Sequence, residues 1–309
     1  MENYLIAMAI SGCLYALMSV GVNVTWGLAG MVNLGLVGFF AVGAYVSALL
    51  TIKLGMPIVI GVIAGAIVAA LTGSLVALIT ARLRGDYLAI VTLGFAETIR
   101  IVASNEIWLT NGSDGLSGIP GPWRGVLSPE MYNLAFLAIV APVVALAYWL
   151  AERLARSPFG RVLRAIRDDE PLVAAAGKSA LVFKLKAFAL SSAALGVAGA
   201  LYGHYTSYIA PEIFVPLLTL YIKLALLTGG RANNLGAVVG GFFIVFLLET
   251  ARFVIPSVPG LSAVQGAALQ QFLIATLLIV ILRLRPSGLL PEPRLFVPVP
   301  DLTKPSPAR

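Results

Sequence analysis

The longest strongly polar stretch of the chain, residues 153–186, reads RLARSPFGRVLRAIRDDEPLVAAAGKSALVFKLK. Basic side chains are frequent in it, and they surround the acidic run Asp168, Asp169 and Glu170. The apolar runs on either side, residues 131–151 and 187–205, each have about the 20 residues that a helix needs to cross a membrane. This pattern predicts a membrane-embedded helix bundle in which residues 153–186 form a polar loop outside the lipid.

The composition of the whole chain supports a membrane protein. Of its 309 residues, 59% are hydrophobic and 11% are charged, whereas a soluble globular domain carries about 25% charged residues. The net charge of +7 comes mainly from a few loops and the tail, which is typical of membrane topology signals rather than of nucleic-acid binding. Cys13 is the only cysteine and lies in an apolar run, which excludes a disulfide and a cysteine-based metal site. We therefore expect no nucleic-acid partner, no metal site and no cofactor.

Apolar runs recur along the chain and predict an all-α, polytopic integral membrane helix bundle with about nine transmembrane segments. They cover residues 4–26, 34–52, 57–80, 87–104, 131–151, 187–205, 214–228, 235–254 and 266–282. Gly-rich joints separate them, and the fourth and seventh runs are short, so either of these two could be a broken or re-entrant helix. We assign residues 1–290 to one transmembrane domain and residues 291–309 to a Pro-rich cytoplasmic tail.

Lys and Arg residues concentrate in the cytoplasmic loops of membrane proteins, and their placement orients this chain. We assign to the cytoplasm residues 153–186 together with Arg82, Arg84, Arg231, Arg283, Arg285, Arg294, Lys304 and Arg309. The loop 105–130 has one basic residue, Arg124, against Glu106, Asp114 and Glu130, which indicates an external loop. Nine spans satisfy both assignments when the N-terminus is outside and the C-terminus is cytoplasmic.

A short helix is predicted within residues 153–186. The acidic run Asp168, Asp169 and Glu170 precedes Pro171, and Gly177 follows three alanines. Acidic residues and Pro favour the start of a helix, and Gly favours its end. Such a helix can dock into a cleft of another protein, or the stretch can be a solvated charged loop. Because the acidic run lies in a loop, we expect none of its members to belong to a buried ion pair.

Two short motifs within apolar runs are similar to each other. Asn33-Leu34-Gly35 leads to Gly38, and Asn234-Leu235-Gly236 leads to a second Gly-containing segment, each after a Gly-rich turn. Transporters built from repeats place broken helices at matching positions near the substrate. Gly also permits close helix packing in any membrane bundle. Both interpretations stay open, and the first makes Asn33, Gly35, Gly38, Asn234 and Gly236 part of a translocation pathway.

Glu97 and Arg100 are ionisable residues within an apolar run, and their spacing lets them pair on one helix face. Charged side chains within a span are costly and usually face the bundle interior or a cavity. Glu97, together with Thr92, is therefore a candidate lining of a pathway, and a structural pair near the outer surface is the alternative. No arrangement of nucleophile, base or metal ligand accompanies them, so no catalytic site is expected.

Five stretches stand in order along the chain: GLAG (27–30) to NLG (33–35) and GAY (43–45), LRGDYLAIVTLGF (83–95), GSDGLSGIP (112–120), SPFGR (157–161) to AIRDDE (165–170), and RLRPSGLLPE (283–292). Each is weak alone. Together they resemble the permease subunits of branched-chain amino acid ATP-binding cassette importers, of the LivM type.

This resemblance implies a transport subunit without enzymatic chemistry, which spans a bacterial cytoplasmic (inner) membrane. The implied partners are a second homologous permease subunit, two cytoplasmic ATP-binding subunits and a periplasmic or extracellular substrate-binding protein, besides membrane lipid. Residues 153–186 become the ATPase-coupling loop, with coupling residues Arg167, Asp168, Asp169, Glu170, Ala174 and Gly177. The implied cargo is leucine, isoleucine or valine. Urea or a short-chain amide is the alternative cargo, and an ion-coupled secondary transporter is the alternative class.

Overall fold

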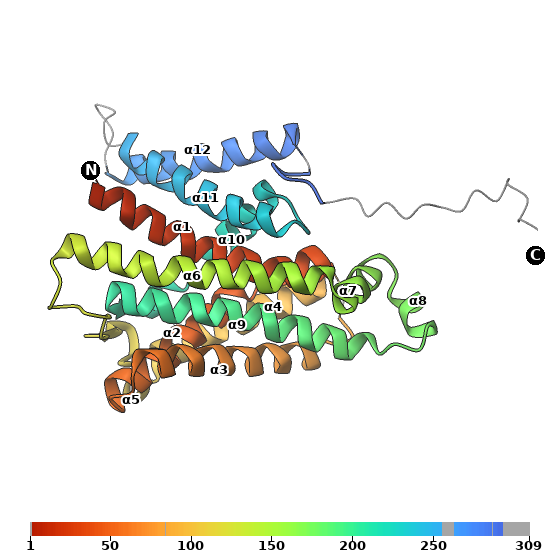
Figure 1. Cartoon of the computed structure of the whole chain (residues 1–309), viewed down its shortest axis with the longest axis horizontal. Coiled ribbons are helices and arrows are strands. Elements are labelled where there is room, and N and C mark those ends of the chain that lie inside the picture. Colours follow the sequence, from red (N-terminus) through yellow and green to blue (C-terminus); the bar gives the residue numbers. More distant parts are fainter. Residues whose placement is uncertain (1, 84, 255–262, 286, 293–309) are drawn as a thin grey trace, which may run out of the picture.

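The computed structural model describes residues 2–83, 85–254, 263–285 and 287–292. In this part of the chain, long helices lie side by side, and the only sheet has two short strands (Figure 1). The long helices are α1 (Glu2–Val22), α2 (Leu36–Lys53), α3 (Ile58–Ile79), α4 (Asp86–Asn105), α6 (Pro129–Arg156), α9 (Ala180–Thr206), α10 (Pro216–Gly229), α11 (Asn234–Val254) and α12 (Ala263–Leu284). Shorter elements are the π-helical segment η1 (Asn23–Leu28), α5 (Ile107–Thr110), α7 (Pro158–Asp168) and α8 (Glu170–Ala175). The predicted all-α membrane bundle is confirmed.

The number of complete spans differs from the prediction. Among the described residues, 8 helices are long and apolar enough to cross a membrane. The seventh predicted span corresponds to α10, an apolar helix of 14 residues, so nine full-length spans are not confirmed. The fourth predicted span is α4, an unbroken helix of 20 residues. Of the two short apolar runs, only the seventh is therefore a shortened helix.

Two helices begin inside the bundle rather than at its end. Leu34, just before α2, donates its backbone N–H to Oγ1 of Thr92 at 2.9 Å. Thr92 lies about 9 Å along α4, at about 1.5 Å of helix rise per residue. Phe214, just before α10, packs its ring against those of Phe40 and Tyr45 in α2, with centroids 5.8 and 5.5 Å apart. The chain therefore passes into the bundle twice without forming an α-helix, at residues 29–35 and at residues 207–215.

Glycines allow close contact among α2, α3 and α9. A Cβ atom on Gly43 would collide with the backbone of Gly196, and one on Gly65 would lie 2.8 Å from the carbonyl oxygen of Gly43. Such close packing drives helix association in lipid, where apolar side chains gain nothing by leaving one apolar medium for another. The outward face of α3 is aliphatic, with exposed Ile60, Ile63, Ile67, Leu71 and Leu75. This face suits direct contact with lipid.

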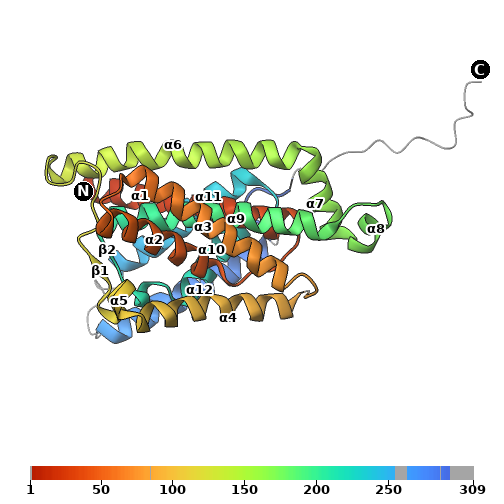
Figure 2. The ribbon, with the colours of Figure 1, turned by 90° about the horizontal axis from the view of Figure 1, so that it is seen from below.

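The two ends of the bundle carry different structures. At one end, β1 (Leu116–Ser117) pairs antiparallel with β2 (Tyr208–Ile209), at the same end as α5 and the start of α1 (Figure 2). His204 holds this end together, because its Nδ1 lies 2.7 Å from Pro120 O and its Nε2 lies 2.8 Å from Ser47 Oγ. The opposite end carries α7 and α8 (Figures 1 and 2). Loop 105–130 and the described N-terminal residues therefore lie at one end, and residues 156–180 at the other, as the predicted alternation of spans requires.

Candidate functional site

Residues 153–186 fold into the end of α6, α7, α8 and the start of α9. Asp169 caps α8, since its Oδ1 accepts the N–H of Leu172 at 3.1 Å. Gly177 follows α8 with a φ of +75°, a left-handed conformation that glycine adopts readily. The predicted short helix between the acidic run and Gly177 is confirmed. α7 was not expected, although Ser157, which caps it through a side-chain hydrogen bond, and Pro158 form a recognisable helix-start signal.

An ion pair anchors α8 to α9. Nζ of Lys184 lies 2.6 Å from Oε1 of Glu170, and 12% and 22% of the two side chains are exposed. Glu170 thus belongs to a half-buried pair, whereas we expected the whole acidic run to lie in a loop without a buried pair. The reason is that α9 starts directly after α8 and brings Lys184 against it. The other side of α8 is open, with Leu172, Ala174 and Gly177 exposed.

Arg167, in the last turn of α7, connects three segments. Its Nη1 donates to the carbonyl oxygen of Gly27 in η1 at 2.9 Å and lies 3.1 Å from Oε2 of Glu292, beyond α12. Its Nε lies 3.2 Å from Oδ1 of Asp168. A Cβ atom on Gly30 would lie 2.7 Å from Cγ of Arg167, so the glycine makes room for the arginine stem. A displacement of α7 must therefore disturb η1 and residues 287–292.

A hydrogen-bonded chain continues from η1 into the bundle. Asn23 is fully buried; its Oδ1 accepts the N–H of Ala232 at 2.8 Å, and its Nδ2 donates to Oδ1 of Asn234 at 2.9 Å. Asn234 in turn donates to Oε2 of Glu152 in α6 at 2.9 Å. The sequence motif Asn234-Leu235-Gly236 indicated Asn234, whereas no predicted motif included Asn23. A polar amide within the first apolar run was the available signal, because buried polar groups need partners.

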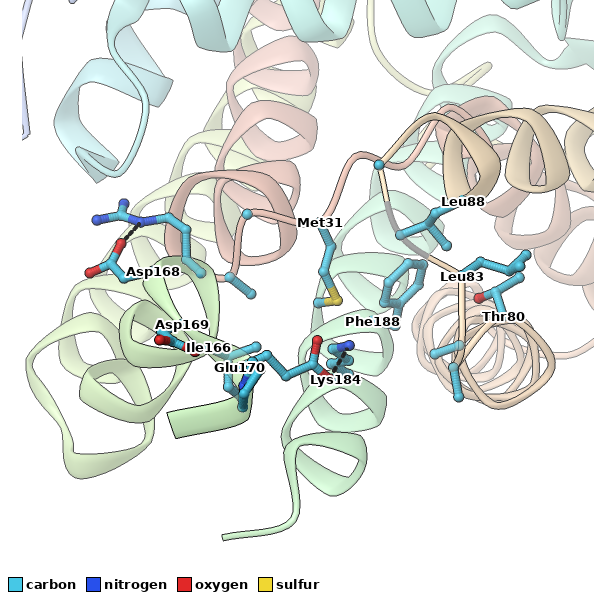
Figure 3. A pocket seen from close by; sticks show the side chains of 17 residues that line it. Met31, Thr80, Leu83, Leu88, Ile166, Asp168, Asp169, Glu170, Lys184 and Phe188 are labelled. Carbon is cyan, nitrogen blue, oxygen red and sulfur yellow. Dashed lines mark hydrogen bonds and ion pairs between the residues drawn. The ribbon is translucent and has the colours of Figure 1, made fainter. Parts of the chain in front are cut away.

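A cavity of about 320 Å³ lies between the acidic run, the turn after η1 and the connection from α3 to α4. Glu170 and Lys184 point toward each other in it, and Met31, Leu83 and Phe188 line it as well (Figure 3). Charged and apolar side chains thus share one cavity. In the part of the chain that the structure describes, no group of His, Cys, Asp and Glu is placed to hold a metal ion.

Four predicted pathway residues meet where α2 starts beside α4. The N–H of Gly35 donates to Oδ1 of Asn33 at 2.7 Å, and Thr92 accepts the N–H of Leu34. A Cβ atom on Gly35 would lie 2.5 Å from the carbonyl oxygen of Thr92, and one on Gly38 would lie 2.8 Å from Cα of Ala96. We call Asn33, Gly35, Gly38 and Thr92 the α2–α4 joint.

The other two Gly-motif residues lie in a different contact. Gly236 packs against Gly229 of α10, where a Cβ atom would lie 2.6 Å from the Gly229 carbonyl oxygen. Asn234 takes part in the chain from Asn23 described above. As in the α2–α4 joint, an asparagine holds the first turn of the helix, because Oδ1 of Asn233 accepts the N–H of Gly236 at 3.1 Å. The two motifs therefore have similar local roles but do not form one site within this chain.

Glu97 and Arg100 form the predicted pair on α4. Nε of Arg100 lies 3.1 and 3.0 Å from the two carboxylate oxygens of Glu97, and 30% of the arginine and 36% of the glutamate side chain are exposed. In Figure 2, α4 lies at one edge of the bundle. The pair therefore faces outward from this chain. Thr92, which is on the same helix, faces the α2–α4 joint instead.

Comparison with known proteins identifies relatives along almost the whole chain. The family described as branched-chain amino acid transport system / permease component matches residues 4–282. The high-affinity branched-chain amino acid transport system permease protein LivM of Salmonella typhimurium is 31% identical over 303 residues, which cover 91% of this chain and 68% of the relative. No solved structure matches.

Two further relatives are also permease proteins of branched-chain amino acid transport. The probable branched-chain amino acid transport permease protein LivM of Methanocaldococcus jannaschii is 31% identical, with 92% of each chain covered. LivH, another high-affinity branched-chain amino acid transport system permease protein, from Escherichia coli K12, is 23% identical, with 91% of this chain and 92% of the relative covered. The chain belongs to the permease-component family of branched-chain amino acid transport systems.

Proposed function

We propose that this chain is the permease subunit of an ATP-binding cassette importer that moves leucine, isoleucine or valine across a bacterial cytoplasmic membrane. The family match over residues 4–282 carries this proposal, because it covers all of the long helices except their ends near the termini. The named activities of the LivM relatives support the cargo class. The chain itself would carry no enzymatic chemistry, and separate subunits would hydrolyse ATP.

The proposed assembly contains a second permease, two cytoplasmic ATP-binding subunits and an external substrate-binding protein. A second permease is supported by the fact that E. coli and S. typhimurium each have both a LivM and a LivH relative of this chain. We orient the end that carries α7 and α8 toward the cytoplasm, because basic residues gather there. The N-terminus is then outside. Residues 1–290 form the permease domain, and most of the proposed tail 291–309 lies outside the described residues.

We propose that the ATP-binding subunits dock on α8. Its exposed Leu172, Ala174 and Gly177 form a small convex surface, while the Glu170–Lys184 pair holds its opposite side. A push on α8 reaches α9 through Lys184 and η1 through Arg167. π-helical segments are rare and are found frequently at functional sites. ATP binding and hydrolysis would in this way change the opening of the passage by alternating access.

We place the passage on the α4 side of the bundle, between the two permeases. The α2–α4 joint would be the mobile part of its wall, because α2 begins there outside regular helix. The Nδ2 of Asn33 is buried without a hydrogen-bond partner among the described residues, so the joint has an unused donor. Asn234 and Gly236 would form a second joint at the start of α11, coupled to η1 through Asn23.

Reconstitution tests the proposed function. The chain is co-expressed with a LivH-type permease, ATP-binding subunits and a substrate-binding protein of a branched-chain amino acid transport system, purified and placed in lipid vesicles with ATP inside the lumen that represents the cytoplasm. We expect uptake of radiolabelled leucine that requires both ATP and the binding protein. Uptake of urea instead would reject the cargo class, and leucine uptake by this chain alone, driven by an ion gradient, would reject the importer itself.

A further inference from the structure

The outward face of α4 has a different chemistry from the outward face of α3. The exposed residues on α3 are aliphatic, as described above. On α4, exposed or half-exposed positions include Ile90, Val91, Gly94, Glu97, Thr98, Arg100 and Ile101. A Cβ atom on Gly94 would meet nothing within 4 Å, so the surface is open one turn below the ion pair. Lipid chains can solvate the α3 face, but they offer no partner to the charges on α4.

Glu97 lies well away from both ends of α4. With about 1.5 Å of rise per residue, Glu97 lies about 16 Å from the start of α4 and about 12 Å from its end. Arg100 is nearer to the end, at Asn105, and long side chains near a span end usually extend to the interface. Its guanidinium is instead turned back to Glu97, deeper in the helix. Ionisable groups at such a depth face other protein or water-filled space.

We propose that Glu97 and Arg100 form a binding site for the charged ends of a zwitterionic amino acid in the passage beside α4. The inference rests on the proposed function. A carboxylate and a guanidinium one helical turn apart match the ammonium and carboxylate of the cargo, and guanidinium binds carboxylate through two parallel hydrogen bonds. Ile90, Val91 and the open surface at Gly94 accept the apolar side chain. Without cargo the two residues neutralise each other, which keeps the passage free of net charge.

This pairing also explains why one site can both bind and release its cargo. The cargo competes with an existing ion pair, so the gain from each new contact is offset by the loss of the old one. Transit requires such moderate binding, because a site that holds too tightly stops conduction. The opposite wall comes from the second permease, so the site is complete only in the assembled transporter.

Thiol labelling in the assembled transporter tests whether the α4 face borders water. In a Cys13→Ala background, Thr98→Cys beside the pair is compared with Ile67→Cys on the aliphatic face of α3, a control of similar exposure. We expect a charged methanethiosulfonate reagent to modify Thr98→Cys at least tenfold faster than Ile67→Cys, and 10 mM leucine to slow only the former. Equal rates would overturn the passage on this face, and a fast rate that leucine does not change would overturn the binding site.

Neutralising the pair tests its role toward cargo. The double variant Glu97→Gln/Arg100→Gln removes both charges together and leaves neither one unpaired, so the variant should fold and assemble. We expect at least a tenfold fall in leucine transported per ATP hydrolysed, while Glu97→Asp/Arg100→Lys, which keeps both charges but loses the paired hydrogen bonds of the guanidinium, retains more transport than the neutral variant. A neutral double variant with normal leucine transport would overturn the inference, and so would one that no longer co-purifies with its partners, because the pair would then serve assembly. If the unaltered transporter moves no leucine, the proposed function fails first.

Discussion

Replacement of Asn23 by leucine breaks the hydrogen-bonded chain that joins η1 to α11. Leucine has the same branched arrangement of side-chain heavy atoms as asparagine but neither donates nor accepts, so the backbone N–H of Ala232 and the side chain of Asn234 each lose a partner. Both groups are buried, with Ala232 6% and Asn234 3% exposed, so bulk water does not easily replace Asn23. The perturbation therefore acts mainly through unsatisfied polar groups.

The size of the effect follows from these two bonds. A buried N–H left without an acceptor costs about 1–3 kcal/mol. An interhelical side-chain hydrogen bond in a membrane protein contributes about 0.6 kcal/mol on average and about 1.7 kcal/mol at most. Since Asn234 keeps its bond to Glu152, only its bond to Asn23 is lost. The sum predicts that Asn23→Leu lowers the free energy of unfolding by about 2–5 kcal/mol.

Titration of the purified chain with SDS in mixed micelles, followed by tryptophan fluorescence, measures this free energy. Asn105→Leu is the matched control, because Asn105 is exposed and its side chain donates only within its own helix, to Ile101 O. The control should change stability by less than about 0.5 kcal/mol. The double variant Asn23→Leu/Asn234→Leu should lose less than the sum of the single variants, because they share one bond. An Asn23→Leu variant as stable as the Asn105→Leu control would refute the argument.

Three further predictions follow from the described contacts. Thr92→Val, which keeps the side-chain shape but removes the acceptor of the Leu34 N–H, should destabilise the chain by about 1–3 kcal/mol in the same titration; an unchanged midpoint would mean that the α2–α4 joint does not depend on this bond. Lys184→Met should weaken co-purification of the ATP-binding subunits because it removes the ammonium that lies 2.6 Å from the Glu170 carboxylate and holds α8 to α9, and the double variant Glu170→Gln/Lys184→Met should restore it, since removing both partners of a pair costs less than removing one; a double variant no better than the single one would contradict this. Cysteines introduced at Ser113 and Ser179, which are both exposed, should react with an impermeant maleimide from opposite sides of the membrane, and labelling from the same side would reject the proposed topology.

The sequence could predict features that depend on neighbouring residues. Span lengths, the helix between Asp169 and Gly177, and the pairing of Glu97 with Arg100 all depend on groups within a few positions of each other. Helix rise, end capping and the spacing of three residues along a helix are the same in any protein, so these predictions needed no knowledge of how the helices pack. The shortened α10 was partly visible for the same reason, since its apolar run is brief.

Only the tertiary structure decided which distant polar groups meet. Asn23 bonds Asn234 across 211 positions, and the N–H of Leu34 reaches Thr92 across 58. Even Lys184 meets Glu170 only because α9 folds back against α8. Such contacts depend on which helix faces which. The sequence does not settle this, because the helices have similar apolar patterns and their many small residues would allow several different close packings. The sequence by itself therefore determined a membrane bundle, the approximate bounds of its spans and a charged helix at one end. The packing of the helices decided that Glu97 faces outward and that Arg167 joins α7, η1 and residues 287–292. The physical reason is that glycines let the backbones approach closely, and this approach sets how far apart the helices and their side chains lie.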